Sequence, residues 1–323
     1  MRVVRTLVIS DLHLGQEGGV SVLTRPRPLE LLLGAIPGYD RLVLLGDTIE
    51  LQEVGASDSV PVAEPILRAI GAALGPDREV LLVPGNHDHL LIREWTLARG
   101  ESLAREDVVP LDATPLLARV VSWLAPAKVE VRYPAVWLTD RVWAVHGHHL
   151  NHYLVPVSSF GVLHPRHRQE RDSPRRPFEF EYLPSSLPRP GMRDGLPPPR
   201  WHDHVLPKQL SPVMSRLLDA QMRRHALPAM AQAAHALETD ADYVIFGHVH
   251  RLGPLARDRT SQWLGWDRRQ QLLNTGSWRY EPVVSHRTHP PHPYWPGGAV
   301  VIAEDGVPRP LGLLDACSED DFR

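Results

Sequence analysis

Five apolar runs in this chain are each followed, within five residues, by Asp, His or Asn, and this recurrence restricts the fold more than any other feature of the sequence. Each run is four residues long and most are rich in Val, Ile and Leu, which predicts buried strands. Polar side chains are poor core material, because burying one without a partner costs roughly a few kcal/mol. We therefore expect the polar groups after these strands to gather at a functional site. The runs are residues 6–9, 42–45, 80–83, 142–145 and 243–246.

Segments with helical periodicity lie between the apolar runs. In one of them Ile66, Ile70 and Leu74 fall on a single helix face. We expect helices at 29–36, 61–74, 90–98, 114–124, from 211 onward and at 228–237. Further strands are expected at 129–132, 136–138, 271–273 and 299–303. Strands that alternate with helices predict an α/β architecture, in which the carboxyl ends of parallel strands share one edge of a sheet.

Composition and charge exclude several classes of protein. A chain of 323 residues can hold one large domain, or a core domain with an insertion. The net charge of −3 provides no basic field, so nucleic acid is a possible but disfavoured partner. The single cysteine, Cys317, excludes an intrachain disulfide framework and a structural zinc site built on cysteines. The sequence also has no signal segment or membrane-spanning apolar run, and we expect a cytoplasmic protein.

Residues 151–209 differ in composition from the rest of the chain. Proline and arginine are frequent there, regular periodicity is weak, and several aromatic residues are interspersed. We expect an insertion with little secondary structure, which could be a cap over the domain, a solvated loop or an interaction arm. Its arginines could hold a second phosphate or an anionic leaving group. They are Arg166, Arg168, Arg171, Arg175 and Arg176.

The polar residues after the five strands have the chemistry of metal ligands. Any one of them could simply cap a helix, so the inference depends on the whole set. Seven ligand groups exceed the four that one metal ion typically needs, and they suit two ions about 3.5–4 Å apart that share a carboxylate. Such a pair holds phosphate oxygens and converts a bound water into a hydroxide nucleophile. The seven are Asp11, His13, Asp47, Asn86, His146, His248 and His250.

The type of ligand indicates the type of metal. Mixed nitrogen and oxygen donors favour Mn, Fe, Zn, Co or Ni over Ca or Mg. We expect two divalent ions, with Mn²⁺ as the first choice.

The order of these motifs resembles that of the calcineurin-like metallophosphoesterases. The blocks Asp-x-His, Gly-Asp, Gly-Asn-His-Asp, His-Gly and Gly-His-x-His occur in this order between residues 11 and 250. We expect one metallophosphoesterase domain over residues 1–323, with the Pro- and Arg-rich residues 151–209 inserted in it; this insertion is not typical of the enzymes that the chain resembles. The resemblance implies a four-layer α/β sandwich, in which two mixed β-sheets are flanked by helices.

The resemblance also implies a role for each motif residue. Asp47 would bridge the two metal ions. His87 would protonate the leaving group or stabilise the transition state, with Asp88 orienting its ring. The first ion would be bound by Asp11, His13, Asp47 and His250, and the second by Asp47, Asn86, His146 and His248.

Within this superfamily the chain is similar to bacterial enzymes of the UDP-diacylglucosamine pyrophosphohydrolase group. The similarity lies in residues 11–15, in His146-Gly147 and in the helices before residues 247–251. The chain differs at His87, where that group typically has Arg, and at His148, where it typically has an acidic residue. We therefore carry over the chemistry of the superfamily and not the lipid substrate.

The predicted function is that of a binuclear metal-dependent phosphoesterase. It would hydrolyse a phosphomonoester, phosphodiester or pyrophosphate bond through a metal-bridging hydroxide. The substrate would be a phosphorylated small molecule or a nucleotide-like compound. The alternatives are a nuclease, a cyclic-nucleotide phosphodiesterase, and a non-catalytic scaffold that keeps the fold.

Two further segments leave their roles open. The histidines at 148, 149 and 152 could contact substrate, but a solvated loop or support of the ligands explains them as well. Residues 274–278 could touch the site, or could only form a tight glycine turn after a strand.

Overall fold

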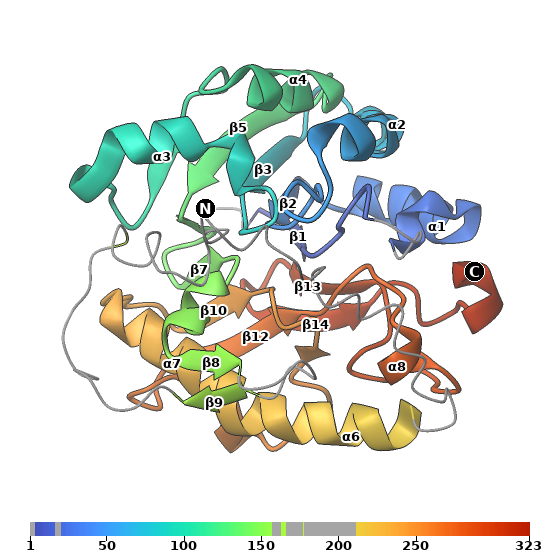
Figure 1. Cartoon of the computed structure of the whole chain (residues 1–323), viewed down its shortest axis with the longest axis vertical. Coiled ribbons are helices and arrows are strands. Elements are labelled where there is room, and N and C mark those ends of the chain that lie inside the picture. Colours follow the sequence, from blue (N-terminus) through green and yellow to red (C-terminus); the bar gives the residue numbers. More distant parts are fainter. Residues whose placement is uncertain (1–3, 17–20, 157–162, 166–176, 178–210) are drawn as a thin grey trace, which may run out of the picture.

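The computed structural model describes residues 4–16, 21–156, 163–165, 177 and 211–323. Within them the chain forms two large β-sheets with helices on the outside (Figure 1). The first sheet has seven strands in the order β14-β13-β1-β2-β3-β5-β4, and the second has five in the order β11-β12-β10-β7-β6.

Both large sheets are mixed. In the seven-stranded sheet β1, β2, β3 and β5 run parallel, and β4, β13 and β14 pair antiparallel. In the five-stranded sheet β7, β10 and β12 run parallel, and β6 and β11 pair antiparallel. The strands of the first sheet are β1 Thr6–Ile9, β2 Arg41–Leu45, β3 Glu79–Val83, β4 Asp107–Val109, β5 Lys128–Tyr133, β13 Gly298–Ile302 and β14 Pro308–Gly312. Those of the second are β6 Ala135–Trp137, β7 Val142–Val145, β10 Tyr243–Phe246, β11 Leu252–Gly253 and β12 Gln271–Thr275.

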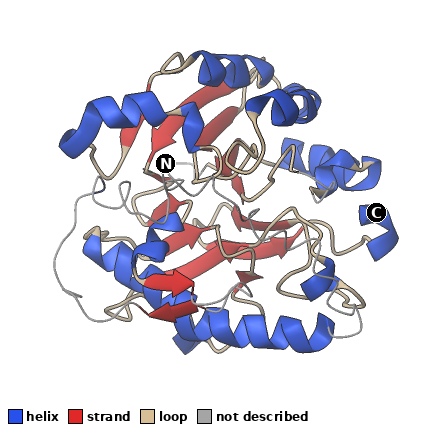
Figure 2. Cartoon of the chain, viewed as in Figure 1, coloured by secondary structure: helices blue, strands red, loops and turns tan. Residues whose placement is uncertain are grey.

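Helices lie at the two outer sides of the molecule (Figures 1 and 2). Buried residues of α1, α2 and α4 pack against the seven-stranded sheet, and those of α7 pack against the five-stranded sheet. A π-helical segment, Met222–Ala226, joins α6 to α7 without a loop. The α-helices are α1 Pro26–Ala35, α2 Ala56–Leu74, α3 Arg93–Arg99, α4 Pro115–Trp123, α6 Ser211–Gln221, α7 Leu227–Ala236 and α8 Pro282–Ser285.

Alternate residues of each central strand face different cores. In β2, Leu42 and Leu44 pack toward the helices, whereas Val43 contributes to a core between the two sheets. In β10, Ile245 joins the core between the sheets, and Val244 joins the core under α7. Both faces of these strands are therefore buried, which explains their continuous apolar sequences. Three cores separate four layers, and the predicted α/β sandwich of two mixed sheets flanked by helices is confirmed.

The sequence patterns missed the short peripheral strands. β4, β11 and β14 were not expected, because a short edge strand lacks the long apolar run that identifies a buried one. Helix α2 begins at Ala56, five residues before the predicted start, and contains Pro61 and Pro65.

The first part of the insertion has more regular structure than we expected. A 3₁₀ helix, His148–His152, leads into an antiparallel pair, β8 Leu154–Pro156 and β9 Leu163–Pro165. Most of the remaining insertion, with the predicted cap and its five arginines, lies outside the described residues. Among the helices that the structure describes, none has the length and apolar character to cross a membrane.

Candidate metal centre

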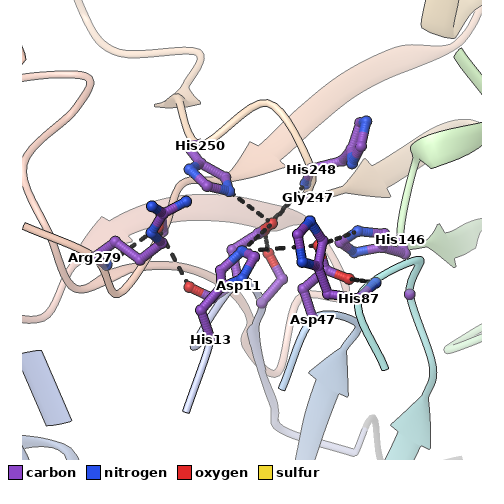
Figure 3. A network of polar contacts seen from close by, with 12 residues as sticks. Asp11, His13, Asp47, His87, His146, Gly247, His248, His250 and Arg279 are labelled. Carbon is purple, nitrogen blue, oxygen red and sulfur yellow. Dashed lines mark hydrogen bonds and ion pairs between the residues drawn. The ribbon is translucent and has the colours of Figure 1, made fainter. Parts of the chain in front are cut away.

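The polar motifs converge between the two sheets. Asp11, Asp47 and His87 follow β1, β2 and β3 of the seven-stranded sheet, whereas His146 and His248 follow β7 and β10 of the five-stranded sheet. Figure 3 shows these side chains pointing toward one another from their separate strand ends. From the sequence we expected the ligands along one edge of a single sheet. In the structure they lie where the strand ends of two sheets face each other.

The backbone at the candidate ligands adopts an uncommon conformation. Positive φ angles occur at eight non-glycine residues of the described chain, and five of these are candidate ligands. Such a conformation costs about 1–3 kcal/mol per residue, and it persists only where the surrounding structure enforces it. The strain is therefore concentrated at this site. The five are Asp11 at 56°, His13 at 45°, Asp47 at 52°, His248 at 67° and His250 at 54°.

Backbone hydrogen bonds and two glycines hold the loops close together. The amide of Asp11 donates to the carbonyl of Gly46 at 3.0 Å, and the amide of His13 donates to the carbonyl of Asp47 at 2.8 Å. A Cβ atom on Gly46 would lie 2.3 Å from Nδ1 of His146. A Cβ atom on Gly85 would lie 2.4 Å from Oδ1 of Asp47, so a side chain at either position would displace a candidate ligand.

Asp11, His13 and His250 form the first group that could hold a metal ion. The Nε2 atom of His250 lies 3.2 Å from Oδ1 of Asp11, and Nε2 of His13 lies 4.0 Å from the same oxygen. The carboxylate of Asp11 also accepts hydrogen bonds from the backbone amide of His248, at 3.0 and 3.2 Å. One carboxylate thus connects the end of β1 to the loop after β10.

Asp47, His146 and His248 form the second group. The Oδ2 atom of Asp47 lies 3.1 Å from Nε2 of His146 and 3.8 Å from Nε2 of His13. Its Oδ1 accepts a hydrogen bond from the backbone amide of His87 at 2.9 Å. Asp47 therefore lies near a histidine of each group, and with His13 and His87 it forms a further group that could hold a metal ion.

In three of the candidate ligand histidines, the Nδ1 atom of the ring contacts an oxygen atom. The Nδ1 atom of His13 lies 3.0 Å from Oε2 of Glu50, and Nδ1 of His250 lies 3.0 Å from Oε1 of Glu281. The Nδ1 atom of His146 lies 2.9 Å from the carbonyl oxygen of Leu45. Histidines that bind metal ions almost always make this contact, which fixes the ring and leaves Nε2 for the metal.

Two buried ligand atoms, Nε2 of His13 and Oδ1 of Asn86, have no hydrogen-bond partner among the described residues. Nε2 of His146 faces the carboxylate of Asp47 at 3.1 Å. Buried polar atoms without partners are costly and are therefore rare in folded proteins. All three atoms belong to the predicted ligand set, so the residues present fit divalent metal ions.

The electrostatics of the site suit cations. Burial by itself would raise the pKa of Asp11, but the ring of His250 outweighs it and lowers that pKa to about 2. Burial is likewise outweighed at Asp47, where His146 holds the pKa well below its usual range. Against the effect of burial, these carboxylates raise the pKa of His146 to about 10 and that of His250 to about 9. Burial lowers the pKa of His13 to about 4, which keeps that ring in the neutral form that coordinates metal.

The prediction that Asp88 orients His87 is wrong. The fully buried carboxylate of Asp88 accepts hydrogen bonds from the backbone amides of Asp47 at 3.3 Å, Thr48 at 2.7 Å and Gly85 at 2.6 Å. The ring of His87 instead meets Glu50, whose Oε2 lies 2.7 Å from Nδ1. The turn after β3 sends adjacent side chains in different directions, so Asp88 joins two ligand loops while His87 faces the site.

Glu50 is therefore a site residue that the sequence patterns missed. Its side chain is fully buried and contacts the rings of both His13 and His87. Burial acts to raise the pKa of Glu50, but the hydrogen bonds to these two rings lower it well below the usual range. No local pattern distinguishes Glu50, because its partners lie 37 residues away on either side.

The two segments left open by the sequence both touch the site. The amide of Trp278 and the hydroxyl of Ser277 donate to the carbonyl of Asp11, at 3.1 and 3.3 Å. The His148 ring is buried, with its centroid 5.6 Å from that of His146. Residues 274–278 thus form more than a tight turn, and His148 belongs to the surroundings of the ligands.

Asn86 and Asn151 lie at the outer side of the second group. The side-chain amide of Asn86 donates to Oε1 of Gln52 at 3.3 Å, which leaves Oδ1 for a metal ion. The side-chain nitrogen of Asn151 lies 3.0 Å from Nε2 of His248. The start of the predicted insertion therefore contacts a candidate ligand.

Comparisons with known proteins identify the family of this chain. The model of the calcineurin-like phosphoesterase family matches residues 4–252, a range that contains every candidate ligand. The UDP-2,3-diacylglucosamine hydrolase of Marinobacter nauticus is 32% identical over 132 residues, which is 39% of this chain and 50% of that protein. The match thus spans about half the length of this curated relative.

Two solved structures are distant in sequence. Yfce, a phosphoesterase from E. coli, and a cold-active protein-tyrosine phosphatase from a Shewanella species each share 12% identity with the chain, at a TM-score of 0.34. The alignments cover 96% of this chain in both cases, and 99% and 80% of the respective structures. Such low TM-scores support no inference about function. The family match extends over most of the chain, and on that ground the chain belongs to the calcineurin-like phosphoesterase family.

Proposed function

We propose that this protein is a binuclear metal-dependent phosphoesterase. The supporting observation is that the carboxylate of Asp47 lies 3.8 Å from Nε2 of His13 in the first ligand group and 3.1 Å from Nε2 of His146 in the second. Buried ligand atoms of His13 and Asn86 also have no hydrogen-bond partner among the described residues. Asp11, His13, Asp47 and His250 would hold one ion, and Asp47, Asn86, His146 and His248 the other. Two divalent ions, when bound there, would neutralise phosphoryl charge and lower the pKa of water.

The residues around the ligands hold this arrangement in place. Glu50 and Glu281 fix the rings of His13 and His250, and the carbonyl of Leu45 fixes that of His146. Asp88 joins the loops that carry Asp47 and Asn86 through their backbone amides. The substrate's phosphoryl group would therefore meet ligands whose geometry is already fixed before it binds.

His87 is the group we assign to the leaving oxygen. Burial acts to lower its pKa, but the hydrogen bond to Glu50 and the negative charges of Asp47 and Glu50 together outweigh burial and raise the pKa. The ring is therefore charged under conditions in which an ordinary histidine is partly neutral. A protonated imidazole at the mouth of the site could donate its proton to the oxygen that leaves phosphorus.

For the substrate we propose a class of compound and not a single type of phosphoester bond. The hydrolase from Marinobacter nauticus supports a phosphorylated small molecule or nucleotide-like substrate, over the matched half of its length. Phosphomonoester, phosphodiester and pyrophosphate bonds all meet the chemistry of the site. We propose Mn²⁺ as the native ion because of the mixed oxygen and nitrogen donors.

The test combines metal analysis with hydrolysis. The protein is purified and reconstituted with Mn²⁺, its metal content is determined, and phosphate release is measured on phosphomonoesters, nucleotides and sugar nucleotides, alongside an aryl phosphodiester. We expect about two ions per chain and hydrolysis that Asp47→Asn abolishes together with metal binding. A protein that binds metal but hydrolyses none of these compounds would be the non-catalytic scaffold instead.

A further inference from the structure

Arg279 is a cation beside the metal centre that the proposed ligand set does not use. Figure 3 shows it next to His13 and His250. It follows Ser277 and Trp278, which are hydrogen-bonded to the carbonyl of Asp11. The backbone that carries the guanidinium group is thus fixed relative to a candidate ligand.

The guanidinium group of Arg279 keeps most of its hydrogen-bonding capacity. Among the described residues its acidic contact is Glu281, whose Oε1 lies 3.5 Å from Nη1 of Arg279 and 3.0 Å from Nδ1 of His250. The Nε atom of Arg279 is buried and has no partner among the described residues. The side chain is 14% exposed, so it is largely enclosed but still reached by solvent. A guanidinium has five N–H donors, and a single distant carboxylate satisfies few of them.

Arg251 is an arginine of this chain whose role is structural, and it is paired with two carboxylates. Its fully buried guanidinium makes two hydrogen bonds to Asp258, at 2.8 and 2.6 Å, and a third to Asp219 at 2.5 Å. The same group lies over the ring of Trp263. Arg279 has no such set of partners in the part of the chain that the structure describes, and it lies beside two candidate ligands, His13 and His250 (Figure 3).

We propose that Arg279 binds an anionic oxygen of the phosphorylated substrate and thereby determines specificity; this inference rests on the proposed function. The planar fork of arginine matches two oxygens of a phosphoryl group, and the hydrogen bonds are strengthened by charge. Glu281 contacts both the guanidinium group and the ring of His250, so it links Arg279 to a candidate ligand.

The test uses the variants Arg279→Ala and Arg279→Lys in the full chain, with Arg269→Ala as control. Arg269 is 89% exposed on the turn before β12, at the opposite end of that strand. Metal content, inhibition by inorganic phosphate and kcat/KM are measured for each. We expect Arg279→Ala to keep its metal ions, and to weaken phosphate inhibition and kcat/KM about 10- to 100-fold. Added guanidinium should restore part of the loss, and Arg279→Lys should lie between the alanine variant and the wild type.

Two measurements in this experiment identify the phosphoryl group whose oxygen Arg279 contacts. Weaker inhibition by inorganic phosphate assigns the arginine to the reacting phosphoryl group. A loss confined to substrates with a second phosphoryl group assigns it to that group instead, and both results support the inference.

The inference is overturned if Arg279→Ala behaves like Arg269→Ala, or if its activity falls only in proportion to lost metal. If Arg279→Ala does not fold, Arg279→Lys decides, and the inference is overturned if that variant has wild-type phosphate inhibition together with wild-type kcat/KM on every substrate, including those with a second phosphoryl group. A wild-type protein with no hydrolytic activity would instead contradict the proposed function, so the two failures are distinct.

Discussion

At the scale of single residues, His87 and Asp88 are neighbours in sequence with separate roles. The ring of His87 contacts Glu50, while Asp88 accepts hydrogen bonds from three backbone amides. His87 is placed to take part in the reaction, whereas Asp88 holds the loops together. Substitutions of the two residues should therefore have different effects.

His87→Ala should retain its metal ions and slow turnover about 10²- to 10⁴-fold, which is the usual contribution of a general acid. A nitrophenolate leaves phosphorus without a proton, so the loss should be smaller on a nitrophenyl ester than on an alkyl ester. Steady-state kinetics on the two esters measure this difference. Equal losses on both would mean that His87 does not protonate the leaving group.

Glu50→Gln should lower metal affinity or turnover about 10- to 100-fold, because Glu50 fixes both His13 and His87. Metal titration and kcat report the two effects separately. Glu53→Gln is the matched control, since Glu53 is an exposed glutamate three residues further along. Wild-type behaviour in Glu50→Gln would show that the two rings are held by their packing alone.

At the scale of elements, the turns after the strands determine where the ligands lie. Helix-forming and strand-forming patterns predict most of the elements, because burial of both faces gives β1, β2, β3 and β10 unbroken apolar sequences. The turns themselves combine positive φ angles with glycines that no side chain can replace. Their conformation is held by contacts between loops and is not encoded locally.

Gly85→Ala should lower both metal content and thermal stability, because its Cβ atom would lie 2.4 Å from a carboxylate oxygen of Asp47. Overpacking of this kind typically costs about 1–3 kcal/mol. Gly34→Ala is the control: Gly34 lies within α1, a Cβ atom there would meet nothing within 4 Å, and alanine is the better helix former. Thermal unfolding of both variants measures the contrast, and equal melting temperatures would refute the steric argument.

At the scale of the whole molecule, the candidate centre connects two sheets. Asp11 and Asp47 belong to the seven-stranded sheet, and His146, His248 and His250 to the five-stranded sheet. Ions bound between them would link the sheets, in addition to the apolar core that they share. We propose that residues 1–323 form one domain around this centre, with residues 151–209 inserted. Cytoplasmic location stays a prediction.

Removal of metal ions should therefore lower the melting temperature as well as abolish hydrolysis. A ligand present at 100 times its dissociation constant stabilises the folded state by about 2.7 kcal/mol. Thermal unfolding is compared in the presence of Mn²⁺, after chelation, and after Mn²⁺ is returned. An unchanged melting temperature after complete chelation would show that the ions do not bind between the sheets.

The sequence alone determined the α/β class, most central strands and helices, and the choice of candidate ligand residues. These features follow from local patterns: apolar runs, helical periodicity, and polar residues at strand ends. The tertiary structure decided which partners those residues meet. Glu50, Glu281 and Arg279 reach the site from distant positions, and Asp88 turns away from His87 toward the backbone. A local pattern cannot specify these contacts, because they depend on where two separate sheets bring their strand ends together.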